Sequence, residues 1–160
     1  MIDSLHWFDN LMQAKVEVFF AKLHSDASTP TRGSKSAAGW DLCALEDTEV
    51  MKNKSTKIRT GIAIAIPEGW EGQIRSRSSL GAKGMIMPNG IGTIDSDYRG
   101  ELLVLATWIG DGLSIKLQKG ERIAQLVISQ IPETNFTEKN FDELTKTDRG
   151  TGGFGSSGRF

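Results

Sequence analysis

The sequence predicts an all-β protein, built as a sandwich or a jelly-roll-like barrel. Three observations lead to this fold class. Several short runs alternate apolar residues with polar or small ones, which is the periodicity of half-buried strands. Eighteen glycines are spread between these runs rather than gathered in a repeat, as expected of tight turns and bulges. Only the stretch around Ser79–Lys83 suits a short internal helix.

The first element is an N-terminal appendage, residues 1–13. It is short for a stable isolated helix, so we expect a short N-terminal helix that packs on the body or on a neighbouring subunit, in preference to a functional segment. One face of that helix would carry the apolar residues Leu5, Trp7, Phe8, Leu11 and Met12.

A β core is expected from residue 14 to residue 132. Its first strand follows from the period-two run Lys15–Phe20, and a loop rich in Ser, Thr, Pro and Gly runs from Ser25 to Ala37. The turn Pro67-Glu68-Gly69 ends one of the later strands. Those later strands are predicted at residues 40–45, 56–66, 70–76, 91–95, 101–109, 113–117 and 122–131.

The last part, residues 133–160, is predicted to be a polar strap followed by a glycine-rich lid. Fixing one residue costs about 1–2 kcal/mol of backbone entropy, and more for glycine. The run from Arg149 to Arg159 is therefore either disordered or ordered by a ligand. With these parts, residues 1–160 make a single domain.

Composition excludes several classes of protein. With 19 Lys and Arg against 20 Asp and Glu, the chain has no overall basic character, so we expect no nucleic-acid partner. No apolar run approaches the ~20 residues of a membrane span, and the start does not resemble a signal peptide. The single cysteine, Cys43, cannot form an internal disulfide. These features favour a soluble intracellular protein.

Two internal clusters can carry chemistry. Arg77, Ser78 and Ser79 lie at a strand end next to the predicted helix, where guanidinium groups and free amides favour phosphate. The alternative is a solvated strand edge. Further on, a strand runs into Asp95 and Tyr98, and a carboxylate at a strand end can hold and deprotonate a water. An acidic β-turn is the ordinary alternative.

The glycine-rich tail is a third candidate. Its backbone amides, with Arg149, Ser156 and Ser157, could cradle a phosphate, although the segment is not a Walker A loop. Phe154 could stack on a nucleobase, whereas a flexible linker end is the alternative. Asp41 and Gln125 are each ambiguous alone. No His and Cys cluster has the spacing of zinc ligands.

Taken in order, these segments resemble the five motifs of the trimeric dUTP pyrophosphatase (dUTPase) family. The resemblance covers residues 38 to 158, and five motifs in the right order are far more specific than any one. The segments that match are Ala38–Leu42, Arg77–Ser79, Asn89–Gly100, Gly120–Leu126 and Arg149–Gly158.

The resemblance implies a distorted jelly-roll or β-clip barrel and Mg²⁺-dependent hydrolysis of dUTP to dUMP and pyrophosphate. That reaction supplies dUMP for thymidylate synthesis and keeps uracil out of DNA. It also implies a homotrimer whose active sites are shared between subunits, with dUTP as partner, no nucleic acid and no membrane. The expected location is the cytoplasm, or the host cytoplasm or nucleus for a virus-encoded protein.

The resemblance also implies residue roles. Asp95 would activate the water that attacks the α-phosphorus, and Tyr98 would stack beneath the deoxyribose. A β-hairpin from about Asn89 to Val104 would read uracil. Asp41 would contact Mg²⁺ through water, the metal itself being chelated by the triphosphate. The further substrate-binding residues would be Arg77, Ser78, Ser79, Asn89, Thr93, Ile94, Gln125, Arg149, Phe154, Gly155, Ser156 and Ser157.

Two positions depart from the family's pattern, with Ser79 where Gly is usual and Gly81 where Ala is common. Two other functions stay open. One is a regulatory protein-binding module on a dUTPase scaffold. The other is a dCTP deaminase relative, which needs a differently placed Glu that the sequence does not offer beside Asn89–Tyr98.

Overall fold

The computed structural model describes residues 15–153, so the predicted N-terminal helix and the tail from Phe154 lie outside the described residues. Nearly all regular structure is β, which confirms the predicted all-β class. Within residues 15–153 two short helices occur, α2 (Ser78–Gly81) and the 3₁₀ helix η1 (Phe141–Glu143). The strands are β1 (Phe19–Lys22), β2 (Trp40–Cys43), β3 (Thr48–Met51), β4 (Thr56–Arg59), β5 (Ile62–Ala65), β6 (Trp70–Ser76), β7 (Met85–Ile86), β8 (Gly92–Ile94), β9 (Leu103–Trp108), β10 (Ser114–Leu117) and β11 (Arg122–Gln130).

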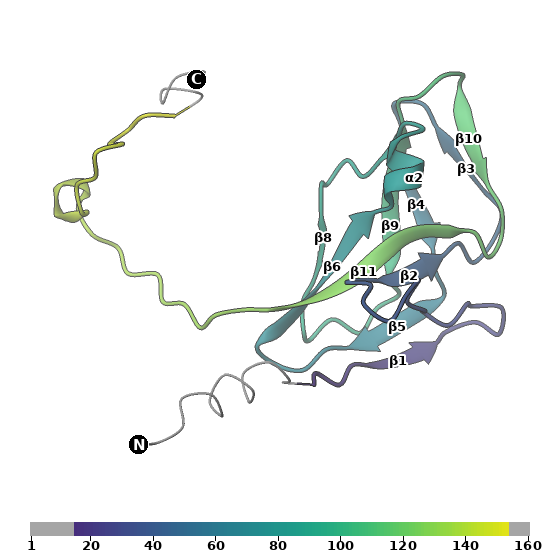
Figure 1. Ribbon diagram of the computed structural model, residues 1–160, viewed down its shortest axis with the longest axis horizontal. Coiled ribbons are helices and arrows are strands. Elements are labelled where there is room, and N and C mark those ends of the chain that lie inside the picture. Colours follow the sequence, from purple (N-terminus) through teal and green to yellow (C-terminus); the bar gives the residue numbers. More distant parts are fainter. Residues whose placement is uncertain (1–14, 154–160) are drawn as a thin grey trace.

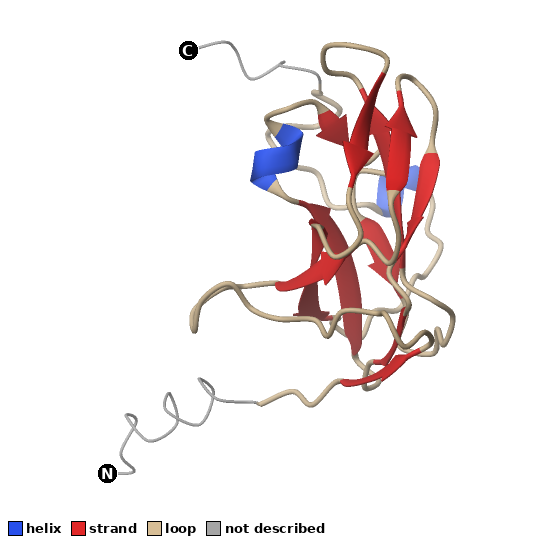
Figure 2. Ribbon diagram, turned by 90° about the vertical axis from the view of Figure 1, so that its right-hand side faces the viewer, coloured by secondary structure: helices blue, strands red, loops and turns tan. Residues whose placement is uncertain are grey.

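The strands form one larger sheet and several smaller ones (Figure 1). The four-stranded sheet has the order β2-β11-β6-β8, and a three-stranded sheet has the order β4-β9-β7. Strands β1 and β5 form an antiparallel pair, as do β3 and β10. Helix α2 lies at the outside of the strands, directly after β6 (Figure 2). This arrangement places the end of β6 and the start of α2 at the surface.

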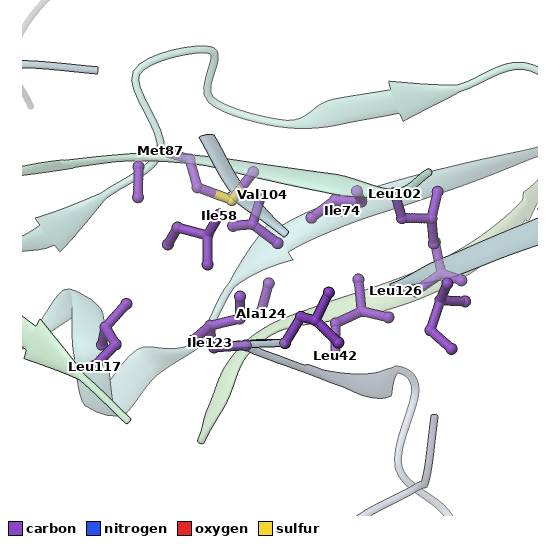
Figure 3. Close-up of a cluster of buried hydrophobic side chains, with 14 of the residues drawn as sticks. Leu42, Ile58, Ile74, Met87, Leu102, Val104, Leu117, Ile123, Ala124 and Leu126 are labelled. Atoms are coloured by element: carbon purple, nitrogen blue, oxygen red, sulfur yellow. The ribbon is translucent and has the colours of Figure 1, made fainter. Parts of the chain in front are cut away.

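The core lies between the two larger sheets (Figure 3). Leu42, Ile74 and Leu126 come from the four-stranded sheet, while Ile58 and Val104 come from the three-stranded one, and each is at most 3% exposed. Because side chains alternate along a strand, the neighbours of Leu42, Ile74 and Leu126 on their own strands point to the opposite face. Asp41 and Gln125 lie on that opposite face.

The predicted strand 56–66 is two strands in the structure. The break falls at Thr60-Gly61, where Gly61 has a φ of +69°, a conformation that side chains with a Cβ rarely adopt. The Thr60 hydroxyl donates to the Leu102 carbonyl over 2.7 Å, which satisfies the buried side chain at the turn. The period-two pattern of Ile58, Thr60, Ile62, Ile64 and Ile66 continues through this turn, so the pattern does not indicate a break there.

Three other elements differ from the prediction. The first strand begins at Phe19 rather than near Lys15, and its side chains are exposed. Val16 and Val18 are half-buried without lying in a strand. The short strands β3 and β7, of four and two residues, were not predicted.

After β11 the chain leaves the body, and we call residues 131–153 the strap (Figure 1). The Ile131 amide donates to the Gly69 carbonyl over 2.8 Å. Beyond it, the described hydrogen bonds of the strap stay within the strap, as between Arg149 Nε and the Gly152 carbonyl. Phe136 and Phe141 are exposed. Within residues 15–153 no helix is long and apolar enough to cross a bilayer.

Candidate active site

One cluster of site residues gathers where β2, β11 and β6 lie side by side. Gln125 is directly opposite Asp41 in the register of β11 with β2, and Arg77 follows the end of β6. Asp41 Oδ1 lies 3.5 Å from Arg77 Nε, and Asp41 Oδ2 lies 3.0 Å from Arg122 Nη1. Arg77 also donates from Nη1 to the Arg122 carbonyl over 2.8 Å. We call these four residues the carboxylate–arginine cluster.

Gln125 is held over Gly39, directly before β2. A Cβ on residue 39 would lie 2.8 Å from Gln125 Oε1, so the glycine leaves the room that this amide occupies. Gln125 Nε2 is 3.5 Å from the Ser76 carbonyl. The first and fourth sequence motifs are therefore brought together by strand pairing and by the lack of a side chain at residue 39.

Ser78 and Ser79 form the first turn of α2. Arg77 occupies the N-cap position with extended backbone, and no side chain caps this helix. Unpaired amides at a helix start carry partial positive charge and point outward. Both serines are exposed, so their hydroxyl and amide groups are accessible beside the Arg77 guanidinium. Positive and hydrogen-bonding groups converge here, as phosphate binding requires.

Asp95 and Tyr98 lie at the other end of β6. Strand β8 is antiparallel to β6, with Ile94 opposite Gly72, so Asp95 comes beside the Glu71 end. From Glu71 to Arg77 the strand spans about 20 Å at a rise of ~3.3 Å per residue. One chain therefore does not bring Asp95 to the carboxylate–arginine cluster.

Tyr98 is fixed across a tight turn. Its hydroxyl donates to the Glu101 carbonyl over 3.0 Å, and its ring lies against Gly100, where an added Cβ would overlap the ring. The Glu101 carboxylate in turn accepts from Arg59 Nε at 3.1 Å and from the Gly61 amide at 2.8 Å. Asp95 is exposed at the start of this turn, and its carbonyl accepts from the Tyr98 amide.

The two strands of the expected uracil-reading hairpin lie in different sheets. Strand β8 pairs with β6, whereas β9 pairs with β4 and β7. Among the described residues β8 has one partner strand and forms the edge of its sheet. Backbone N–H and C=O groups along such an edge are available to another molecule. Thr93 and Asn89 are exposed on this edge or next to it.

The structure adds two residues to the site that sequence reasoning did not assign. Arg122 lies within the fourth motif, but nothing in the sequence showed that its side chain reaches Asp41. Glu101 follows the third motif, and a charge directly after the turn was the only available signal. Arg149 lies in the strap, away from both clusters, and Phe154, Gly155, Ser156 and Ser157 lie outside the described residues.

The surroundings of Cys43, which lies two residues after Asp41 on β2, change the pKa of its thiol. Burial raises the pKa of the Cys43 thiol, and a hydrogen bond with Ser28 lowers it to a smaller extent. This thiol is therefore a poor nucleophile at neutral pH, because the thiolate is the reactive form.

In residues 15–153 no group of three His, Cys, Asp or Glu side chains is placed to hold a metal ion.

Comparison with known proteins agrees with the motif pattern. The family model described as dUTPase matches residues 25–158, which is most of the chain. The chain belongs to the dUTPase family. A similar protein from Wolinella succinogenes is 42% identical over 146 residues, which cover 91% of this chain and 96% of that protein. One from Chlamydia trachomatis serovar L2 is 43% identical over 143 residues, covering 88% and 97%. Both are named deoxyuridine 5'-triphosphate nucleotidohydrolase.

Solved dUTPase structures share the fold. The Staphylococcus bacteriophage 80alpha dUTPase bound to dUpNHpp is 28% identical, with a TM-score of 0.77 over 89% of this chain and 98% of that one. This likeness is consistent with the jelly-roll or β-clip description of the strands. The family assignment accounts for the order of the five motifs along the chain.

Proposed function

We propose that this chain hydrolyses dUTP to dUMP and pyrophosphate by Mg²⁺-assisted attack of water on the α-phosphorus. The reaction would supply dUMP for thymidylate synthesis and keep uracil out of DNA. The observation that carries the proposal is the edge strand β8, which runs directly into Asp95 and the fixed ring of Tyr98. The names of the relatives and the dUpNHpp bound to the 80alpha dUTPase support it.

Uracil is recognised by the edge of β8. Uracil presents one N–H between two carbonyls, a pattern that matches the alternating donors and acceptors of an extended backbone edge. Gly92 sits against Ile74, where a Cβ would be 3.2 Å from Cβ of Ile74, so the strand carries no side chain there. Asn89 adds an amide, and Thr93 and Ile94 supply the backbone that the base contacts.

Asp95 acts as the general base. It is exposed, so a water can reach its carboxylate, and it immediately follows the strand that holds the base. The Tyr98 ring supports the deoxyribose from below. A 2′-hydroxyl would press against that ring or lose its hydration there, which selects deoxynucleotides over ribonucleotides.

The phosphates are bound by the carboxylate–arginine cluster of a different subunit. Arg77 presents a fork of donors that fits phosphate oxygens, and Ser78, Ser79 and Gln125 add hydroxyl and amide groups. Because this cluster lies about 20 Å from Asp95 along β6, a complete site needs two chains. That separation supports the homotrimer with shared active sites.

Exposed apolar surface also supports an assembly. A groove of about 450 Å³ is lined by Val16, Phe20, Trp40, Ile64 and Ile128, among others, and Phe20 and Trp40 are 47% and 42% exposed. Exposed apolar patches commonly mark protein interfaces.

The strap from Ile131 to Arg149 can extend up to about 60 Å, far enough for its end to reach another subunit. Phe154 would cover uracil there, while Arg149, Gly155, Ser156 and Ser157 bind the outer phosphates.

When bound, Mg²⁺ would be held mainly by the triphosphate, and Asp41 would contact it through water. Carboxylate oxygens suit this hard cation, which keeps several waters and uses few protein ligands. Both Asp41 oxygens already face guanidinium groups, which favours contact through water over direct coordination. The bound metal would neutralise charge on the phosphates. Catalysis then rests on positioning and electrostatics.

The test is pyrophosphate release from dUTP, dTTP, dCTP and UTP with Mg²⁺, alongside EDTA controls. We expect rapid release from dUTP alone and none in EDTA. Ammonia release from dCTP would instead assign the chain to the deaminases. No turnover of any nucleotide would refute the proposal and favour the regulatory protein-binding module.

A further inference from the structure

A bulge in β11 brings Arg122 to the carboxylate–arginine cluster. Gln125 pairs with Asp41 and Ala124 with Leu42, but the next partner of Cys43 is Arg122 rather than Ile123. Ile123 is the extra residue, and its side chain is fully buried in the core. Two consecutive residues, Ile123 and Ala124, therefore face the core. Regular alternation would have turned Arg122 away from Asp41, and bulges near active sites often redirect a side chain in this way.

Once redirected, Arg122 holds two members of the cluster at the same time. Its Nη1 donates to Asp41 Oδ2 over 3.0 Å, and its carbonyl accepts from Arg77 Nη1 over 2.8 Å. The side chains of Asp41 and Arg77 are 14% and 23% exposed, whereas that of Arg122 is 52% exposed. Asp41 is thus placed between two guanidinium groups, of which Arg122 is the nearer one.

We propose that Arg122 is a positioning residue for the phosphate-binding side of the active site. It draws the Asp41 carboxylate toward its own guanidinium and so prevents a close Asp41–Arg77 pair, which leaves the charge of Arg77, held in place by the Arg122 carbonyl, available to substrate phosphate. The inference rests on the proposed function, because it assigns Arg77 to phosphate. Without the Arg122 side chain, Asp41 would pair with Arg77 alone, and the pair, now at 3.5 Å, would close.

The main variant is R122Q, which removes the charge and keeps the backbone carbonyl that Arg77 uses. We expect kcat/KM for dUTP to fall about 10- to 100-fold, the usual effect of losing a group that orients a ligating or catalytic residue. Affinity for dUpNHpp should weaken, while affinity for deoxyuridine, which has no phosphate, should not change. R122K, which keeps one charged donor for Asp41, should recover part of the loss.

The matched control is K119Q. Lys119 lies three residues earlier, in the turn before β11. It also forms an ion pair, with Asp26 at 2.7 Å, and its side chain is similarly exposed, at 51%. It contacts no residue of the cluster, so K119Q should stay within about twofold of the unmodified protein in kcat/KM. If R122Q falls no further than K119Q, the inference is wrong.

A double-mutant cycle separates positioning from direct binding. If Arg122 acts through Asp41, then R122Q combined with D41N should be about as impaired as D41N alone, because residues in one network are not additive. If instead the fold-losses of R122Q and D41N multiply in the double variant, Arg122 acts on the substrate directly, and the inference is overturned. If R122Q does not fold, R122M, which keeps the aliphatic stem, takes its place in the cycle.

Failure of the proposed function is recognised separately. An unmodified protein that releases no pyrophosphate from dUTP refutes the function, and the inference is then decided by binding alone. Weaker dUpNHpp binding by R122Q with unchanged deoxyuridine binding would still support it. Equal dUpNHpp binding by R122Q and K119Q, or none by the unmodified protein, would overturn it.

Discussion

Replacing Gly100 by Ala should damage substrate discrimination and leave stability almost unchanged. A Cβ at residue 100 would overlap the hydroxyl end of Tyr98 and come within 3.0 Å of its Cε2. The tip of a flexible side chain can move, so the ring should swing out and release the Glu101 carbonyl to which it now donates. The perturbation therefore removes the proposed sugar platform without touching the core.

The two effects on stability nearly cancel. Losing the exposed Tyr98 hydrogen bond costs about 0.5–1.5 kcal/mol. Gly100 does not have a positive φ, so alanine fits the backbone and gains about 0.4–1 kcal/mol by restricting the unfolded chain. The net change should stay below about 1 kcal/mol, which corresponds to a Tm shift of at most ~2–4 °C.

The effect on activity should be larger. One face of the ring is about a quarter of the ~200 Å² that an aromatic side chain can bury, and ~50 Å² at ~25 cal/mol per Å² is worth about 1.3 kcal/mol. We therefore expect kcat/KM for dUTP to fall about tenfold, with a smaller ratio of dUTP to UTP turnover. Steady-state pyrophosphate release measures kcat/KM for dUTP and UTP, and calorimetry measures the Tm.

Gly33→Ala is the control, because nothing lies within 4 Å of a Cβ at residue 33. It should match the unmodified protein in kinetics and Tm. If G100A kept both its dUTP activity and its discrimination against UTP within twofold, Tyr98 would not be the sugar platform, and the account of this turn would be wrong.

Four further predictions follow from the site and the fold. Asp95→Asn should abolish dUTP turnover and leave dUpNHpp affinity nearly intact, as measured by calorimetry; a large loss of affinity would count against its role as base. Ending the chain after Asp148 should remove most activity with no fall in Tm, since the described strap makes no hydrogen bond to the body beyond Ile131, and full activity would exclude the lid. Gly61→Ala should destabilise the fold by about 1–3 kcal/mol in urea denaturation, because φ is +69° and a Cβ would lie 2.8 Å from that of Ala27; an unchanged midpoint would contradict this. Iodoacetamide should modify Cys43 at pH 8 more slowly in the folded protein than in urea, because burial raises the thiol pKa. Equal rates in the two states would show that the thiol is not shielded. The stability that the raised pKa of Cys43 contributes is present below the unfolded pKa and is lost as pH rises through the folded pKa.

Much of the fold class and of the motif order could be read from the sequence. Period-two patterns indicated longer strands such as β6, where buried Gly72 and Ile74 alternate with more exposed residues. Arg77 and Asp95 stood out because charged residues stand at the ends of predicted strands, whereas Asp41 and Gln125 were assigned only through the resemblance to the dUTPase motifs. Very short strands such as β7 gave no such signal.

The sequence by itself determined which residues could carry the chemistry, and the tertiary structure decided which of them meet. Asp41 and Gln125 are far apart in sequence, and only the register of β2 with β11 makes them neighbours. The same register contains the bulge at Ile123 that turns Arg122 to Asp41, and a single extra residue leaves no mark on a hydrophobic pattern in which Ile123 and Ala124 are both apolar. The separation of Asp95 from Arg77 likewise depends on strand direction, because β8 runs antiparallel to β6. Pairing and direction arise from contacts between distant segments, so local sequence cannot encode them alone.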